Sequence, residues 1–160
     1  DGRTVGILVD PDGSLEGVGE LRQSVFAAGM VPLIIAPHGG MVGELPVQRT
    51  FATGRSVEFD ALLLAGCPVP AADAIVARDE KVGRAQTAAL DPRVLLLIEE
   101  CWRHGKGIGA WGEGVDALAR AGVEGSPGVV TDSSAAAVLT AVQELMAAHR
   151  VWERFPASVD

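Results

Sequence analysis

The stretch KGIGAWGEGVDAL, residues 106 to 118, decides the fold. Its first half is small and apolar, as in a buried parallel strand, and its second half has the apolar spacing of a helix. The glycines between the two halves indicate a sharp strand-to-helix turn. Many α/β enzymes hold a nucleophilic Ser or Cys at the apex of such a turn. Here the apex is Gly112, followed by Glu113, so we predict a turn without a nucleophile.

Strands and helices also alternate before this stretch. The first part of the chain predicts a strand, a helix and a second strand over residues 4–9, 15–28 and 31–36. Ser14 stands where a helix N-cap is expected, and Gly29 stands where a C-cap is expected. These elements form a β-α-β unit, which is typical of a parallel sheet.

The later part of the chain continues the alternation. Asp91 and Pro92 predict the start of a helix that ends at Gly105. Residues 132–134 are expected to cap a long helix whose apolar face runs from Val138 to His149. The other expected elements are strands over 60–65, 107–111 and 128–131, a short helix over 115–121, and a loop with one or two helical turns over 68–90.

Residues 45–59 interrupt the alternation of strands and helices and predict a small β-hairpin that turns at Thr53 and Gly54. Elsewhere, continuous apolar strands alternate with helices, and this pattern is typical of a parallel sheet covered on both faces. We therefore predict a three-layer α/β fold with a mostly parallel central sheet and a hairpin excursion at its edge.

Composition limits the classes of partner. The 160 residues fit one domain over 1–160, and although 48% of them are apolar, no apolar run approaches the roughly 18 residues of a membrane span. We expect a soluble domain without a membrane partner. The absence of a basic, apolar leader predicts a cytoplasmic location. The net charge of −8 disfavours nucleic acid and favours proteins or small molecules as partners.

The two cysteines are predicted to be reduced thiols. Cys67 follows a predicted strand, but Pro68 denies it a following N–H and no histidine is adjacent in sequence. Cys101 falls in the last turn of a helix, where the helix dipole disfavours a thiolate. Neither thiol is therefore expected to act as a nucleophile.

Cofactor and metal motifs are weak in this sequence. Gly107, Gly109 and Gly112 match the dinucleotide pattern GxGxxG, but the first two fall inside the predicted strand instead of after it. No GxxxxGK[ST] loop is present, and none of the histidines has metal-ligand spacing with another ligand. We therefore expect no bound cofactor and no metal.

Three carboxylates are expected near the carboxyl ends of the strands. Asp10 and Asp12 follow the first strand, and Glu113 lies at the turn. Paired carboxylates can do acid-base work when their pKa values are separated. The alternative, which we favour, is that these acids cap helices and solvate the surface.

The C-terminal stretch ELMAAHRVWERFP, residues 144–156, resembles the end of the large-subunit, monofunctional haem catalases. Those enzymes carry an extra domain of about this length after the catalase core. The stretches DGRTVGILV at 1–9, FDALLLAGC at 59–67 and KGIGAW at 106–111 resemble the same domain. This resemblance spans essentially the whole chain and implies a flavodoxin-like fold of the class I glutamine amidotransferase-like superfamily.

The resemblance also implies a site that has lost its chemistry. Active members of that superfamily present Cys and His at the turn, where this chain has Gly112 and Glu113. Asp10 falls near the position of the acid after the first strand, but it has no nucleophile to assist. Asp10, Cys67, Gly112 and Glu113 are thus expected to line a vestigial crevice.

The same resemblance implies a parent that decomposes hydrogen peroxide to water and oxygen with haem. Haem catalases ligate iron through a tyrosinate and use a distal His with an Asn. This chain contains neither Tyr nor Asn. The haem is therefore expected in the catalase core of the parent, and this domain is expected to be neither haem-bearing nor an enzyme.

Three functional hypotheses follow. The first is a role in stability, assembly and channel access in the tetrameric parent, with the catalase core as partner. Its expected interaction tail comprises Arg150, Trp152, Arg154 and Phe155, unless the two aromatic residues cover the domain's own core. The second is a chaperone-like holdase that binds unfolding client proteins, and the third is a residual small-molecule hydrolase or deglycase. Homodimerisation of the isolated domain is left open.

Overall fold

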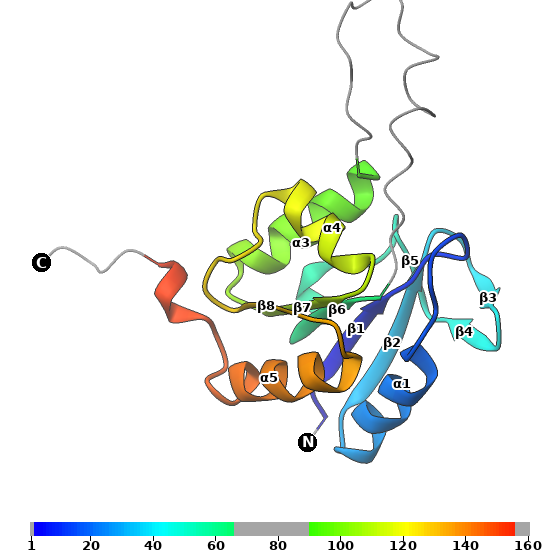
Figure 1. Cartoon of the computed structure of the whole chain (residues 1–160), viewed down its shortest axis with the longest axis horizontal. Coiled ribbons are helices and arrows are strands. Elements are labelled where there is room, and N and C mark those ends of the chain that lie inside the picture. Colours follow the sequence, from blue (N-terminus) through cyan, green and yellow to red (C-terminus); the bar gives the residue numbers. More distant parts are fainter. Residues whose placement is uncertain (1, 66–89, 156–160) are drawn as a thin grey trace, which may run out of the picture.

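The centre of the molecule is a six-stranded sheet in which every strand pairing is parallel (Figure 1). The computed structural model describes residues 2–65 and 90–155. The strands lie in the order β5-β2-β1-β6-β7-β8. Their bounds are Thr4–Leu8 for β1, Val31–Ala36 for β2, Arg49–Thr50 for β5, Ala61–Leu64 for β6, Gly107–Trp111 for β7 and Val129–Asp132 for β8.

Helices cover both faces of this sheet. On one face lie α1 (Val18–Ala27) and α5 (Ala135–Ala147), and on the other lie α3 (Pro92–Arg103) and α4 (Gly114–Ala121) (Figure 1). Each face has its own cluster of buried apolar side chains. Strands buried on both faces are continuously apolar, which is why their sequences show no alternation. The predicted three-layer α/β fold is confirmed.

The strand order places a crevice beside the glycine turn. If the short edge strand β5 is left out and the other five strands are numbered in chain order, the sheet order is 2-1-3-4-5. This is the strand order of flavodoxin-like sheets. The order reverses between β1 and β6, and ligands of such folds bind at the carboxyl ends of the strands near this reversal. The turn after β7 lies at the same edge, because β7 pairs in parallel with β6.

The first helix begins later than predicted. Helix α1 starts at Val18 after Gly17, whose φ is 77°, so Ser14 is not its N-cap. The Ser14 hydroxyl instead accepts a hydrogen bond from the Glu16 N–H at 3.3 Å. A serine that bonds two residues ahead stabilises a turn in competition with a helix start.

The predicted hairpin is present, but it lies earlier in the chain than the expected 45–59. Its strands are β3 (Gly40–Val42) and β4 (Leu45–Val47), joined at Gly43, whose φ is 59°. Thr53 and Gly54 do close a turn onto the Thr50 carbonyl, but the 3-10 helix η1 (Ser56–Glu58) follows instead of a returning strand. Arg49 and Thr50 pair in parallel with β2 at the edge of the main sheet, and the described residues after them supply no antiparallel strand.

The two later helix starts agree with the sequence, whereas the end of α5 does not. The Asp91 carboxylate caps α3 by accepting from the Arg93 N–H, with Pro92 in the first turn. The Ser134 hydroxyl caps α5 through the Ala137 N–H. Helix α5 ends at Ala147, so His149 lies beyond the helical face on which it was predicted, with a φ of 66°.

Across the ranges 2–65 and 90–155, no helix has both the length and the apolar character needed to cross a membrane. The loop and helical turns predicted for 68–90, and Cys67, fall almost entirely outside those ranges.

Candidate functional site

The turn between β7 and α4 has the geometry of a nucleophile elbow. Gly112 at its apex has a φ of 55°, a left-handed conformation that residues with a side chain rarely adopt. A Cβ placed on Gly112 would meet no atom of the described residues within 4 Å, so none of them fills the space at the apex. A Cβ on Gly114 would collide with the carbonyl oxygen of Leu64, and the Gly114 N–H donates to the Ala65 carbonyl at 3.2 Å. The turn is therefore shaped like an active-site turn, with open space where a nucleophilic side chain would stand.

The predicted carboxylates do lie near one another at this edge of the sheet. Burial raises the pKa of Asp10, and the negative charges of Asp12, Asp91 and Glu113 raise it further. One Asp10 oxygen accepts from the Asp12 N–H at 2.9 Å, and a Glu113 oxygen accepts from the Ser14 N–H at 3.1 Å. Glu113 thus ties the turn after β7 to the loop after β1. These bonds favour a structural role over acid-base chemistry.

A pocket of about 440 Å³ lies beside the apex, lined in part by Glu16, Glu20, Trp111, Gly112 and Ser134. Some of its polar groups are engaged within the fold. The Trp111 indole donates to the Glu16 carbonyl at 3.2 Å, and Ser134 caps α5. Within the described ranges, no group of three or more His, Cys, Asp and Glu side chains is placed to hold a metal ion.

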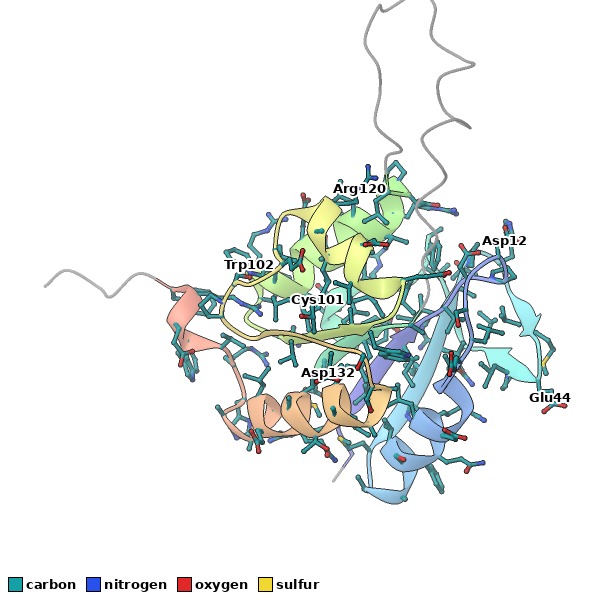
Figure 2. The ribbon with its side chains drawn as sticks, viewed as in Figure 1. Asp12, Glu44, Cys101, Trp102, Arg120 and Asp132 are labelled. Atoms are coloured by element: carbon teal, nitrogen blue, oxygen red, sulfur yellow. The ribbon has the colours of Figure 1, made fainter. Side chains whose placement is uncertain are left out.

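Of the two cysteines, Cys101 lies within the described residues. Cys101 is a free thiol, fully buried between α3 and the sheet (Figure 2). Burial raises its pKa to about 12, so the thiolate required of a nucleophile is suppressed. Cys67, expected in the crevice, lies outside the described residues.

The predicted interaction tail divides into an internal anchor and an exposed part. The Arg154 guanidinium donates to the carbonyls of Pro127 at 2.7 Å, Trp102 at 2.8 Å and Lys106 at 2.9 Å. Its central carbon lies 5.4 Å from the centre of the Trp102 ring, a cation-π contact. Burial lowers the pKa of Arg154 to about 10. Arg154 is thus part of the domain's own packing.

The other tail residues face outward to different degrees. Trp152 is 64% exposed and Phe155 is 43% exposed, with their ring centres 6.1 Å apart. Phe155 and Arg150 pack over Gly105, each about 3.2 Å from where a Cβ would stand. The tail therefore covers its own domain at Gly105 and presents Trp152 to the outside.

Sequence reasoning missed Lys106. It immediately precedes β7, yet only 6% of its surface is exposed. The one sequence signal is a lysine directly before a continuously apolar strand.

Comparison with known proteins assigns the family. The family model for the C-terminal domain found in long catalases matches residues 1–156. The chain belongs to that family. A catalase HPII from Mycobacterium avium is 27% identical to this catalase C-terminal domain over 95% of the chain and 22% of that protein. A catalase HPII from Pseudomonas aeruginosa is 26% identical over 98% of the chain and 21% of that protein.

A third relative, catalase B from Aspergillus fumigatus, is 30% identical over 77% of the chain and 17% of that protein. The chain thus spans about a fifth of the length of these relatives. The family expected from the C-terminal stretch and the first strand is confirmed.

Proposed function

We propose that this chain is a non-catalytic part of a longer haem catalase that decomposes hydrogen peroxide. The observation that carries the proposal is the family match over 1–156 on a chain whose active-site turn has Gly112 at its apex. Haem in catalases is ligated by tyrosinate, and this sequence contains no Tyr. The haem and the chemistry therefore belong to the catalase core of the longer protein.

Within that protein, the domain stabilises the assembly, helps it form a tetramer and limits access to the core channel. Its partners are the core of its own chain and neighbouring subunits. A cytoplasmic location and the absence of a resident cofactor in the domain belong to the same proposal. Support comes from an exposed surface around the C-terminal tail, where Trp152 and Phe155 remain available for contact.

The test compares residues 1–160 with the longer protein. Both are purified after expression with haem supplied, and the Soret absorption and peroxide turnover are measured. We expect a Soret band and rapid turnover from the longer protein and neither from residues 1–160. Turnover at catalase-like rates by residues 1–160 would overturn the non-catalytic assignment, and a longer protein without turnover would overturn the catalase assignment.

A second candidate, a holdase for unfolding proteins, is favoured by exposed apolar side chains. Phe26 and Val57 are each 74% exposed, and Met41 is 62% exposed. These side chains lie on three separate elements, so they would offer separate apolar contact points to an unfolded chain. The test is suppression of thermal aggregation of an unrelated protein at near-stoichiometric ratio, with Phe26→Ser and Val57→Ser combined as the matched variant. Suppression no greater than that of an inert protein removes this candidate.

A further inference from the structure

The amino ends of the strands, opposite the glycine turn, carry a hollow of about 530 Å³. We call it the basal hollow and define it by its lining residues, Val57, Arg103, His104, Lys106, Arg150 and Phe155. We propose that it docks an acidic, apolar-flanked polypeptide segment of the longer protein, with the Lys106 ammonium as counter-ion to a carboxylate of that segment. This inference rests on the proposed function, because it requires that the chain be part of a longer protein.

The first argument is the state of Lys106. Only 6% of the Lys106 residue surface is exposed, so its aliphatic stem is buried, while its ammonium nitrogen keeps some access to solvent at the hollow. Among the described residues, no carboxylate forms an ion pair with it and no oxygen accepts a hydrogen bond from its ammonium. Burial lowers its pKa, and the positive charge of Arg150 lowers it further. An ammonium that stands at the end of a buried stem without a counter-ion would be stabilised by an anion supplied from outside.

Asp60, a carboxylate that acts electrostatically on Lys106, already accepts a hydrogen bond within the domain, from the Thr4 N–H at 2.8 Å. Arg103 lies in the last turn of α3, where a cation complements the helix dipole. That explanation does not extend to Lys106, which precedes a strand.

The second argument is the apolar rim of the basal hollow. Val57 is 74% exposed on one side, and Phe155 on the other is in ring contact with the exposed Trp152. An adjoining pocket of about 570 Å³ shares Val57 and His104 and adds Leu96, which is 52% exposed. A small free anion would leave these side chains in water, whereas a polypeptide segment covers them and supplies the carboxylate together.

The third argument is charge complementarity. The chain carries a net charge of −8, yet the described residues that line the basal hollow include the basic side chains Arg103, His104, Lys106 and Arg150 and no carboxylate. A second copy docked through the same face would oppose like charges. A flat lipid surface would not reach the recessed Lys106 ammonium. An acidic polypeptide segment would both neutralise the basic lining of the hollow and reach the recessed Lys106 ammonium.

Carbodiimide cross-linking of the intact longer protein tests the ion pair directly. This reagent joins an amine to a carboxylate only when the two are in contact. Peptide mass spectrometry should identify Lys106 joined to an Asp or Glu outside residues 1–160. The matched variant Lys106→Arg keeps the charge but lacks the amine, so this cross-link should disappear. A Lys106 cross-link to a second copy of residues 1–160 would overturn the proposal.

A binding measurement keeps the proposal testable if the recessed amine does not react. Residues 1–160 are titrated into the longer protein lacking them, with binding followed by sedimentation. Lys106→Met should weaken binding at least tenfold, while Arg22→Met on α1, which does not line the hollow, should leave it unchanged. Equal affinity of Lys106→Met and the original chain would overturn the proposal. Binding of the original chain to anionic phosphatidylserine vesicles, lost in Lys106→Met, would also overturn it in favour of a lipid partner.

The two proposals fail in different ways. If the longer protein shows no haem absorption and no peroxide turnover, the proposed function fails. If it is an active catalase but the Lys106 cross-link is absent and Lys106→Met binds normally, only the docking inference fails.

Discussion

Gly112 and Gly114 lie two residues apart in the same turn, yet they are required for different reasons. At Gly112 there is room for a side chain, but the φ of 55° disfavours one. At Gly114 the obstacle is contact, because a Cβ would overlap the Leu64 carbonyl. The turn therefore has the close backbone packing of a nucleophile elbow at Gly114 and an unfilled side-chain position at Gly112.

These two glycines give the first prediction. Gly114→Ala should lower the free energy of unfolding by about 3 kcal/mol, because α4 must move away from β6. Gly112→Ala should cost about 1 kcal/mol, the penalty of a left-handed backbone with a Cβ. Urea unfolding followed by circular dichroism measures both variants. Equal losses for the two would contradict the packing argument.

Asp10 gives a prediction about pH. Burial raises the pKa of this carboxyl above its ordinary value of 3.8 in the folded chain. A carboxyl with a raised folded-state pKa destabilises the fold once it ionises, so stability is lost as the pH rises through that pKa. Asp10→Asn should therefore be more stable than the original chain at neutral pH, by a fraction of a kcal/mol. The difference should vanish below pH 3.8.

The measurement is urea unfolding at the two pH values. Glu124→Gln, in an exposed turn, serves as the control for removing one negative charge from an acidic chain. If Glu124→Gln stabilises the chain as much as Asp10→Asn does, the effect is one of net charge and not of the Asp10 site.

At the scale of elements, the C-terminal tail is held by one short segment. The 3-10 helix η2 (Trp152–Arg154) follows Val151, whose N–H donates to the Gly105 carbonyl at 2.8 Å. Val151 is buried, and a Cβ on Gly128 would collide with it. Arg154 then donates to three carbonyls, those of Trp102 in the last turn of α3, Lys106 just before β7 and Pro127 just before β8. The tail is thus anchored through Val151 and Arg154, and Trp152 is free for external contact.

This anchoring predicts that replacing Arg154 lowers the stability of the domain strongly, whereas replacing Trp152 hardly changes it. Arg154→Met should cost about 2 to 3 kcal/mol, because three carbonyls lose a charged donor. Trp152→Ala should change the free energy of unfolding by less than about 0.5 kcal/mol, as expected of an exposed side chain. Urea unfolding tests stability, and limited proteolysis tests whether Arg154→Met releases the tail. A large loss for Trp152→Ala would mean that this ring covers the domain's own core.

The same scale shows which elements were predictable. The stretch from Gly107 to Ala121 was placed correctly, because an apolar run, a glycine turn and a helical period all agree there. The predicted start of α1 was wrong, because the Ser14 hydroxyl accepts from the Glu16 N–H and the helix begins only after Gly17. The hairpin was displaced, because turn residues at Thr53 and Gly54 do not reveal that Arg49 pairs with a distant strand.

At the scale of the whole molecule, the two ends of the sheet carry different kinds of charged group. The carboxyl ends carry Asp10 and Glu113 beside the bare turn, and the amino ends carry the basal hollow. The loss of a nucleophile was readable from Gly112, because a missing side chain is visible in sequence. The burial of Lys106 was not, since it depends on α3, β7 and the tail coming together.

This division leads to the last prediction, on the stability of the longer catalase. Without residues 1–160, it should keep its haem, but heat should inactivate it at least about tenfold faster, a loss of about 1.4 kcal/mol in the barrier. Lys106→Met should shift the rate in the same direction, because it weakens docking at the amino ends. Glu113→Gln, at the opposite end, should leave the rate unchanged. Half-lives of peroxide turnover at one fixed temperature measure all three, and equal effects of Lys106→Met and Glu113→Gln would contradict docking through the basal hollow.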